Sequence, residues 1–348
     1  MTAVIIGAVV IISYTSVGGF SAVATMDLIQ SVIMSIALIV ITVFGISQAG
    51  GLDVVVENAK SMAGYLSFTQ THDAVAGVAK PYPFLNIASM MAWGLGYFGM
   101  PHILVRFMAI RSEDELTLSR RIASIWVVIS MTVAVCIGMI GMSVSKAGNI
   151  PVLEGSASET IVVQISNLLS TFGILPAIVA GFILAGILAA TMSTADSQLL
   201  AASSAFSENL LQDVFGIKLT QKQTMLTARL TVICIAIIAV FLASDPNSSV
   251  FNIVSFAWAG FGATFGPAIL FALFWKRSNL QGMMAGLVTG GVMVFAWKFG
   301  ISKLGGMFAI YELMPAFLCA LVAIIVVSLI TPAPEQKILD LFDECNKK

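Results

Sequence analysis

Long apolar runs alternate with short polar segments along almost the whole chain, and charged residues fall almost entirely between the runs. Each run approaches or exceeds the roughly 20 residues that a helix needs to cross a hydrocarbon core of about 30 Å. The pattern predicts nine membrane-spanning helices, at about 1–17, 27–48, 85–108, 120–145, 172–204, 226–243, 249–275, 280–300 and 312–331. We therefore expect an all-α polytopic membrane protein.

The overall composition agrees with a membrane protein and excludes a soluble one. Hydrophobic residues make up 58% of the 348 residues and charged residues 10%, and the mean hydropathy is +0.99. Soluble globular domains carry about 25% charged residues. The net charge is −1 and there is no basic run, so no nucleic-acid partner is expected. Because no nucleophile–base pair, phosphate-binding loop or cysteine-based metal pattern is visible, we expect neither an enzyme nor a bound cofactor.

Basic residues are divided unequally between the two sides of the membrane that these spans define. If the 106–121 loop is cytoplasmic, twelve of the seventeen basic residues are inside, namely Arg106, Arg111, Arg120, Arg121, Lys218, Lys222, Arg229, Lys276, Arg277, Lys337, Lys347 and Lys348. The five on the outside are Lys60, Lys80, Lys146, Lys298 and Lys303. The positive-inside rule then predicts an outer N-terminus and a cytoplasmic C-terminus in a multi-pass protein of the cell membrane.

The span that contains residues 181–200 turns polar in its second half, with the sequence GFILAGILAATMSTADSQLL. On a helix, Ala190, Ser193, Thr194 and Ser197 follow an i, i+3, i+4, i+7 spacing and share one face. Hydroxyl, carbonyl and carboxylate oxygens are the ligands that a hard cation such as Na⁺ uses. Hydroxyls in membrane helices also commonly bond their own i−4 carbonyl or a neighbouring helix, so for the hydroxyls alone both interpretations stay open.

Two carboxylates within or beside the predicted spans need an explanation. A carboxylate near the centre of a membrane helix, as predicted for Asp196, costs about 2.5–3.5 kcal/mol on insertion scales. Such a group is rarely kept without an ion, a proton or a partner, so we interpret Asp196 as functional. Asp27 stands at the predicted start of the second span, after a turn predicted at 14–20. An Asp in that place is most often an ordinary charge that the helix dipole favours.

The third span contains the sequence WGLGYFGMPH at residues 93–102. Its three glycines and one proline weaken a helix, and irregular backbone at membrane depth is tolerated only where it is buried or lines a cavity. Broken helices are typical of secondary-transporter sites, although Gly and Pro are also common in ordinary membrane helices. Trp93 and Tyr97, four residues apart, predict an aromatic pocket beside the break. We interpret His102 as a packed or interfacial residue. Trp258 could face a cavity, although an aromatic residue in a membrane helix more often serves packing.

Segments between and within the other spans predict further structural features. The polar segment 50–83 is expected to form an outer loop or short surface helix, and 147–170 a loop that leads into an amphipathic helix. Gly282, Gly286 and Gly290 recur at four-residue spacing, which predicts a small face where another helix packs closely.

Three long segments resemble the sodium/solute symporter family, in particular its sodium/proline symporters: WGLGYFGMPHILVRFMA, ILAATMSTADSQLLAASSA and VSFAWAGFGATFGPAILFALFW. The likeness runs over essentially the whole chain. It implies a LeuT-type inverted-repeat core of ten helices with extra helices around it. Under this resemblance the first two predicted spans correspond to core helices four and five, the next five to core helices six to ten, and the last two to peripheral helices.

The resemblance also implies roles for individual residues. The family's main sodium site uses a carbonyl and two hydroxyls of core helix eight, which here are Ala190, Ser193 and Thr194. A second sodium site or an ion-release role is implied for Asp27, Asp196 and Ser197. Substrate binding is implied for Trp93, Tyr97 and Pro101. Met100 stands where Gln is expected in the closest proline transporters, so the exact substrate stays open.

The family's first core helix, which contributes to the main sodium site and the substrate site, has no counterpart in these 348 residues. We therefore expect an N-terminally truncated form of the fold, with the first repeat represented only by its last two helices. We also expect that this chain alone does not transport. The expected organisation is a transmembrane transporter domain at 1–331 and a cytoplasmic tail at 332–348.

The function that the resemblance implies is sodium-coupled secondary symport that imports proline, with Na⁺, proline and the lipid bilayer as partners. The substrate could instead be another small organic solute, such as pantothenate, a monocarboxylate or another amino acid. The same helices also occur as the membrane part of sensor proteins, although the short tail after Thr331 argues against that class. An intramembrane enzyme is the weakest alternative.

Overall fold

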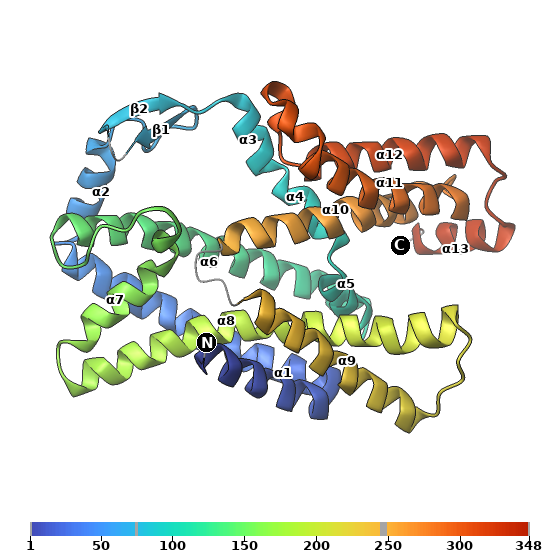
Figure 1. The fold of residues 1–348 in the computed structure, drawn as a ribbon, viewed down its shortest axis with the longest axis horizontal. Coiled ribbons are helices and arrows are strands. Elements are labelled where there is room, and N and C mark those ends of the chain that lie inside the picture. Colours follow the sequence, from blue (N-terminus) through green and yellow to red (C-terminus); the bar gives the residue numbers. More distant parts are fainter. Residues whose placement is uncertain (1, 74–75, 244–248, 347–348) are drawn as a thin grey trace. The chain divides into compact units, whose positions relative to one another are not determined.

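The computed structural model describes residues 2–73, 76–243 and 249–346 (Figure 1). The chain divides into two compact units, each built from two separate stretches of sequence. Unit 1 contains Met1–Ser61 and Ile110–Ser248, and unit 2 contains Met62–Ala109 and Ser249–Lys348. Met1, from the predicted first span, lies outside the described residues, as do Lys347 and Lys348 from the basic set assigned to the cytoplasm.

Unit 1 is built from helices alone within the described residues. They are α1 (Thr2–Gln48), α2 (Leu52–Ser61), α6 (Asp114–Lys146), the 3-10 helix η2 (Gly155–Thr160), α7 (Ile161–Ser170), α8 (Ile174–Ser204), the π-helix η3 (Ala205–Val214) and α9 (Gln221–Leu242). α1 lies along α8, and α6 and α7 pack beside them. The core of the unit includes one large branched side chain from each of these four helices, namely Ile41, Ile140, Ile165 and Ile183.

A turn divides α1 at Gly19, whose φ of 58° and ψ of −155° are not helical. A positive φ is open to glycine at no steric cost, which explains why the chain can reverse at this point (Figure 1). The turn predicted at 14–20 is therefore confirmed. The prediction that Asp27 opens the following helix is wrong, because the helix resumes directly after Gly19 and Asp27 lies well inside it.

Unit 2 combines a short hairpin with helices. Its elements are β1 (Gln70–Asp73), β2 (Val78–Pro81), α3 (Phe84–Met91), α4 (Trp93–Gly96), the 3-10 helix η1 (Tyr97–Gly99), α5 (Pro101–Met108), α10 (Val250–Phe274), α11 (Leu280–Phe299), the 3-10 helices η4 (Ile301–Leu304) and η5 (Gly306–Ala309), α12 (Leu313–Ile330) and α13 (Gln336–Asn346). α10, α11 and α12 pack on one another, and their core includes Ala263, Val294, Leu313 and Phe317.

The polar segments fold partly as predicted. The segment 147–170 ends in the amphipathic helix α7, which buries Ile165 and Leu169 on one face and so confirms that prediction. The segment 50–83 contains the short helix α2, but it also contains an antiparallel hairpin in which Gln70 pairs with Pro81. The hairpin was not predicted because strands of four residues with mixed polarity carry no clear alternation.

The glycines of α11 allow the close packing that their spacing predicts. A Cβ added at Gly282 would lie 1.9 Å from the Ser328 hydroxyl oxygen, and one at Gly286 would lie 2.3 Å from Ile324, both on α12. At Gly290 an added Cβ would lie 2.2 Å from the carbonyl oxygen of Ala263 on α10. The small face of α11 is therefore the surface on which both neighbouring helices rest.

Seven helices in the described part of the chain are long and apolar enough to cross a membrane. They are Gly18–Gln48, Asp114–Lys146, Ile174–Val214, Gln221–Leu242, Val250–Phe274, Leu280–Leu304 and Leu313–Ile330. The predicted span 1–17 corresponds to a shorter apolar helix, Ile5–Ser16, and the predicted span 85–108 is divided into α3, α4, η1 and α5. Many large apolar side chains point away from both cores, which suits a protein surrounded by lipid.

Candidate ion and substrate sites

In unit 1, three of the predicted ligand atoms for sodium lie together on α8. The Ser193 hydroxyl donates to the carbonyl oxygen of Ala190 at 3.2 Å, and the Thr194 hydroxyl lies 3.5 Å from the same oxygen. These contacts are the local bonds that the structural interpretation expects of hydroxyls in a membrane helix. A hydroxyl can rotate and present its lone pairs instead. The geometry therefore places three oxygens within reach of one cation without requiring one.

Asp196 is the most deeply buried acidic group described in unit 1, with none of its surface exposed. The Tyr14 hydroxyl donates to its Oδ2 at 2.7 Å, and the Ser197 hydroxyl lies 3.3 Å from its Oδ1. Ser197 also donates to the carbonyl oxygen of Ser193 at 2.9 Å. Two hydroxyls on different helices therefore orient this carboxylate, which explains how it is tolerated inside the protein.

Asp27 joins the same neighbourhood through Tyr14. The Tyr14 hydroxyl lies near the Gln30 side chain and interacts electrostatically with the Asp27 carboxylate. Because Asp27 lies inside the helix, its charge is not explained by the dipole at a helix start. The Gln30 amide oxygen and the Thr15 hydroxyl are buried and meet no hydrogen-bond partner among the described residues. The Gln30 amide oxygen and the carboxylates of Asp27 and Asp196 are oxygen ligands of the kind that suits a hard cation.

Sequence reasoning missed Tyr14 and Gln30 in this group. An ordinary tyrosine in an apolar span gives no signal by itself, and Gln30 stands among apolar residues on the following helix. The signal that could have found them is spacing. Gln30 follows Asp27 by three residues and shares its helix face, so a polar stripe was readable in the sequence.

In unit 2, the predicted helix break is confirmed between residues 93 and 101. The short helix α4 leads into the 3-10 turn η1, and Met100 then adopts an extended conformation with φ −78° and ψ 110°. Pro101 follows as the first residue of α5. A residue before proline is driven out of the helical region by a clash with the proline ring, which accounts for the position of the break.

Five aromatic rings gather beside this break. The Trp93 ring stacks on Phe251 at 5.4 Å, on Trp258 at 5.7 Å and on Tyr311 at 6.1 Å between centroids. Tyr97 meets Trp258 edge to face at 4.8 Å, and Tyr97 remains 52% exposed. We call these five residues the aromatic cluster. The structure therefore brings Trp93 and Tyr97 together through Trp258.

Trp258 has more than the packing role that its sequence context predicts. Its indole Nε1 donates to the carbonyl oxygen of Trp93 at 3.0 Å. Its ring lies so close to Gly96 that a Cβ added there would approach Nε1 to 1.9 Å. The Trp258 indole on α10 is thus hydrogen-bonded to the α4 backbone and packed against it, next to the break. Pro101 lies beyond the 3-10 turn, at the start of α5.

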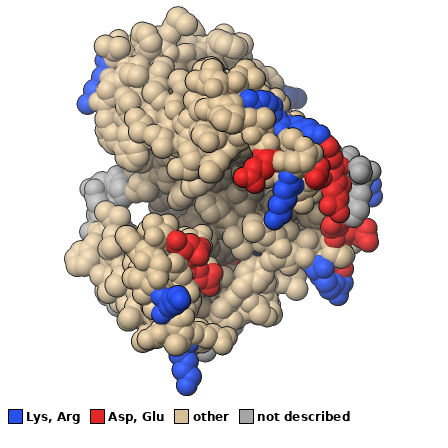
Figure 2. Space-filling model, turned by 90° about the vertical axis from the view of Figure 1, so that its right-hand side faces the viewer, with Lys and Arg blue, Asp and Glu red and all other residues tan. Residues whose placement is uncertain are grey.

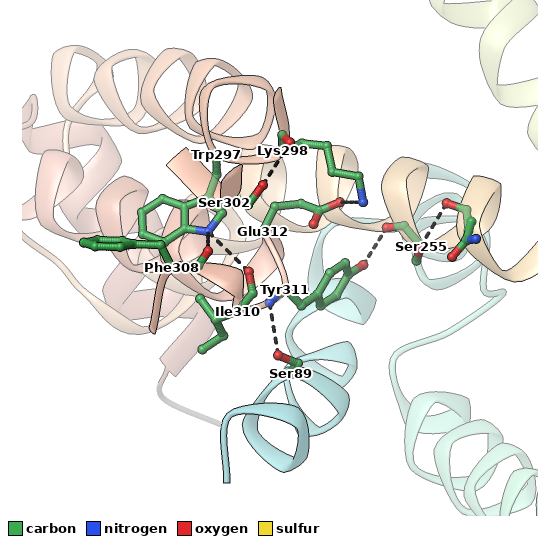
Figure 3. Close-up of polar contacts among 10 residues, drawn as sticks. Ser89, Ser255, Trp297, Lys298, Ser302, Phe308, Ile310, Tyr311 and Glu312 are labelled. Carbon is green, nitrogen blue, oxygen red and sulfur yellow. Dashed lines mark hydrogen bonds and ion pairs between the residues drawn. The ribbon is translucent and has the colours of Figure 1, made fainter. Parts of the chain in front are cut away.

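Tyr311 is the other residue that sequence reasoning missed, because it precedes a helix interpreted as peripheral. Its hydroxyl donates to the carbonyl oxygen of Ser255 on α10 at 2.5 Å (Figure 3). Burial raises the pKa of the Tyr311 hydroxyl, and the neighbouring Glu312 carboxylate raises it further. The hydroxyl therefore keeps its proton at neutral pH and acts as a donor.

Most of the sequence is similar to that of known transporters. A family model described as the sodium:solute symporter family matches residues 1–290. The chain belongs to this family. The family is one of transporters, so the expectation that the chain is not an enzyme is confirmed by this membership.

Curated relatives in the sodium:solute symporter family share more than a third of their aligned residues with this chain. A sodium/proline symporter of Haemophilus influenzae is 39% identical, over 99% of this chain and 67% of the relative. The high-affinity proline transporter PutP of Bacillus subtilis is 37% identical, over 96% and 66%. A sodium/proline symporter of Escherichia coli is 36% identical, over 99% and 65%. The chain thus spans about two thirds of the length of these relatives.

A solved structure confirms the predicted fold class. A Na⁺-coupled sialic acid symporter in a substrate-bound, outward-open state superimposes with a TM-score of 0.69 at 17% identity. The match covers 96% of this chain and 67% of that one. The chain therefore has the helices of the LeuT-like transporter fold over the part that it spans, as expected for the symporter family.

Proposed function

We propose that this chain serves sodium-coupled symport, with proline as the solute. The observation that carries the proposal is the similarity to proteins named sodium/proline symporters, at 36–39% identity over nearly the whole chain. That similarity runs through the polar segment of α8 and through the broken helix with its aromatic cluster. Another small organic solute remains the alternative, because Met100 departs from the residue expected in proline transporters.

The proposed ion roles follow the oxygen groups of unit 1. The carbonyl of Ala190 and the hydroxyls of Ser193 and Thr194 bind the coupling Na⁺, supported by their close placement on one helix. Asp27, Asp196 and Ser197 form a second sodium site or assist ion release. The burial of Asp196 and Ser197, and the nearby Gln30 amide oxygen that meets no hydrogen-bond partner among the described residues, support this role. The proposed cycle uses Na⁺ as the coupling ion and no cofactor.

The proposed substrate contacts follow the aromatic cluster of unit 2. Trp93, Tyr97 and Pro101 line the solute pocket, supported by the stacked rings and by the freed backbone at the break. Apolar walls with a few polar backbone groups suit a small cyclic amino acid. The driving force is the sodium gradient plus about 2.3 kcal/mol per charge per 100 mV of membrane potential. Alternating access moves one group of helices against another around the bound solute.

The proposed orientation places the C-terminal tail in the cytoplasm. Acidic and basic side chains gather on the face that Figure 2 shows. In unit 2, Lys276 after α10 pairs with Asp343 of α13 at 2.5 Å, so the tail helix binds beside basic residues that the positive-inside rule assigns to the cytoplasm. A tag attached at the C-terminus tests this orientation. We expect a protease to cleave the tag only when it is added from the cytoplasmic side of the membrane.

Na⁺-dependent binding of radiolabelled proline tests the proposed function. The 348-residue chain is assayed alone and together with any upstream coding sequence of its gene, and vesicle uptake tests at the same time the expectation that this chain alone does not transport. The double variant Ser193→Ala/Thr194→Ala is expected to lose the Na⁺ dependence of binding. Thr191→Ala is the matched control, because its exposed hydroxyl bonds only the Ile187 carbonyl of its own helix.

The outcomes separate the ion role from the substrate. If proline binds equally well without Na⁺, the ion role of α8 is wrong. If proline does not bind but pantothenate, a monocarboxylate or another amino acid does, the substrate is wrong and the symporter role stands. If Thr191→Ala behaves like the double variant, the loss is not specific to the proposed ligand face.

A further inference from the structure

Tyr311 connects several elements of unit 2 although it lies outside the helices that the sequence links to the substrate. Its backbone N–H donates to the Ser89 hydroxyl of α3 at 3.0 Å. Its hydroxyl donates to the Ser255 carbonyl of α10 at 2.5 Å. Its ring lies nearly parallel to that of Trp93 on α4, at 6.1 Å and 19°. One residue therefore makes directed contacts with three elements around the helix break.

The three contacts lie inside the unit. Ser89 and Ser255 are each 7% exposed, so water competes little for either hydrogen bond. The contact to Ser255 also takes up a carbonyl in the first turns of α10, the same turns that carry Phe251 and Trp258. Tyr311 thus fixes one ring of the aromatic cluster by stacking and two others through the helix that carries them.

The segment before α12 is itself held firmly, so Tyr311 has a fixed base. The Trp297 indole donates to the carbonyl oxygens of Phe308 and Ile310, at 3.1 and 3.2 Å. The next residue along α11, Lys298, pairs with the buried Glu312 carboxylate at 3.1 Å. Figure 3 shows Tyr311 surrounded by these contacts, with Ser89 below it and Ser255 to its right. The residue therefore couples α11 and the start of α12 to the broken helix.

We propose that Tyr311 is a positioning residue of the solute site, which holds the Trp93 ring and the first turns of α10 in the arrangement that binds solute. The inference rests on the proposed function, because it takes Trp93 as a solute contact. It assigns a binding-related role to a residue in the segment before α12, which the sequence does not link to the solute. A residue that merely anchored α12 would alter stability and leave solute affinity unchanged.

Equilibrium binding of radiolabelled proline at saturating Na⁺ tests the role of the hydroxyl. Tyr311→Phe keeps the ring and removes only the donor to Ser255. Loss of one buried hydrogen bond that orients the site is expected to raise the Kd for proline about three- to tenfold. The Na⁺ concentration for half-saturation is expected to stay within twofold of wild type, because the sodium ligands lie in the other unit. A purely structural fault would lower the amount of folded protein instead.

Two control variants and a second test variant keep the result specific. Ser302→Ala removes a hydroxyl from η4, between α11 and Tyr311, and this hydroxyl bonds only the Lys298 carbonyl at the end of α11. Tyr82→Phe makes the same chemical change at a tyrosine whose hydroxyl makes no hydrogen bond to the described residues. Both are expected to bind like wild type. Ser89→Ala removes the acceptor of the Tyr311 N–H and is expected to shift the Kd in the same direction as Tyr311→Phe.

The failure of this inference can be told apart from failure of the proposed function. If Trp93→Ala weakens proline binding and Tyr311→Phe leaves it within twofold of wild type, the inference is overturned and the proposed function stands. If wild type binds another solute rather than proline, the same comparison is made with that solute.

If neither proline nor any of the alternative solutes binds, backbone hydrogen exchange tests the inference about Tyr311 instead. Tyr311→Phe is then expected to accelerate exchange at residues 93–96 and 251–258 relative to Ser302→Ala. Equal exchange in the two variants overturns the inference.

Discussion

Replacing Gly96 by alanine tests how closely the broken helix packs on α10. A Cβ at this position would lie 1.9, 2.3 and 2.8 Å from Nε1, Cδ1 and Cε2 of Trp258. The backbones of α4 and α10 are also close one turn further along α10, since a Cβ added at Gly262 would lie 2.6 Å from the Gly96 Cα. The indole must therefore move away, which breaks its hydrogen bond to the Trp93 carbonyl and opens the ring stack.

The expected cost of Gly96→Ala combines three effects. Overpacking of a well-packed site costs about 1–3 kcal/mol. The lost hydrogen bond adds about 0.5–1.5 kcal/mol. Alanine in place of glycine in a helix stabilises the protein by about 0.5–1 kcal/mol, because the unfolded chain with alanine has less conformational entropy to lose. The net loss in free energy of unfolding is about 2 kcal/mol, and solute binding is expected to weaken with it.

Gly94→Ala is the matched control because Gly94 lies on the same short helix and is exposed. An added Cβ there has nothing within 4 Å. That variant is expected to be as stable as wild type or up to about 1 kcal/mol more stable. The assay is denaturant or thermal unfolding in detergent followed by tryptophan fluorescence, which also reports movement of Trp93 and Trp258. Equal stability and equal emission spectra for the two alanine variants would refute the packing argument.

Two further perturbations test contacts that the tertiary structure shows. Tyr14→Phe removes a donor to the buried Asp196 carboxylate, and is expected to lower the free energy of unfolding by about 1–3 kcal/mol. The loss should shrink in an Asp196→Asn background, and a double-mutant cycle that shows no coupling would contradict it. Lys298→Met leaves the Glu312 carboxylate buried without its cation and is expected to destabilise by about 1–3 kcal/mol. The control Lys303→Met changes an exposed lysine, and its free energy of unfolding should stay near that of wild type. Equal losses of stability in the two variants would contradict the role of the ion pair.

Much of the fold could be predicted from local sequence. The bounds of α8, α10, α11 and α12 agree with the predicted spans to within a few residues. They could be predicted because a backbone inside lipid must satisfy its own hydrogen bonds, so a long apolar run leaves little choice but a helix. The break before Pro101 was equally readable, since glycine and proline act on their own neighbours.

The helix that carries Asp27 shows where local reasoning stops. The sequence places polar and small residues over 14–20, and a turn was expected there, but the helix resumes at once after Gly19. The change of direction is confined to that single glycine, so the residues that follow continue as a helix. Asp27 consequently lies deep in the helix, where its charge must be satisfied by neighbours rather than by a helix end.

Sequence by itself determined the class of protein, the bounds of most spans and the break in the third span, and it predicted which residue types could bind a cation or line a solute pocket. Only the tertiary structure decided which of these residues meet. The Tyr14 hydroxyl reaches Asp196 from 182 positions away, and the Tyr311 hydroxyl reaches Ser255 across 56. Hydropathy and local conformation act over a few residues. Contacts between distant helices depend on how side chains of particular size fit together, as at the glycines of α11, and no local pattern records that fit.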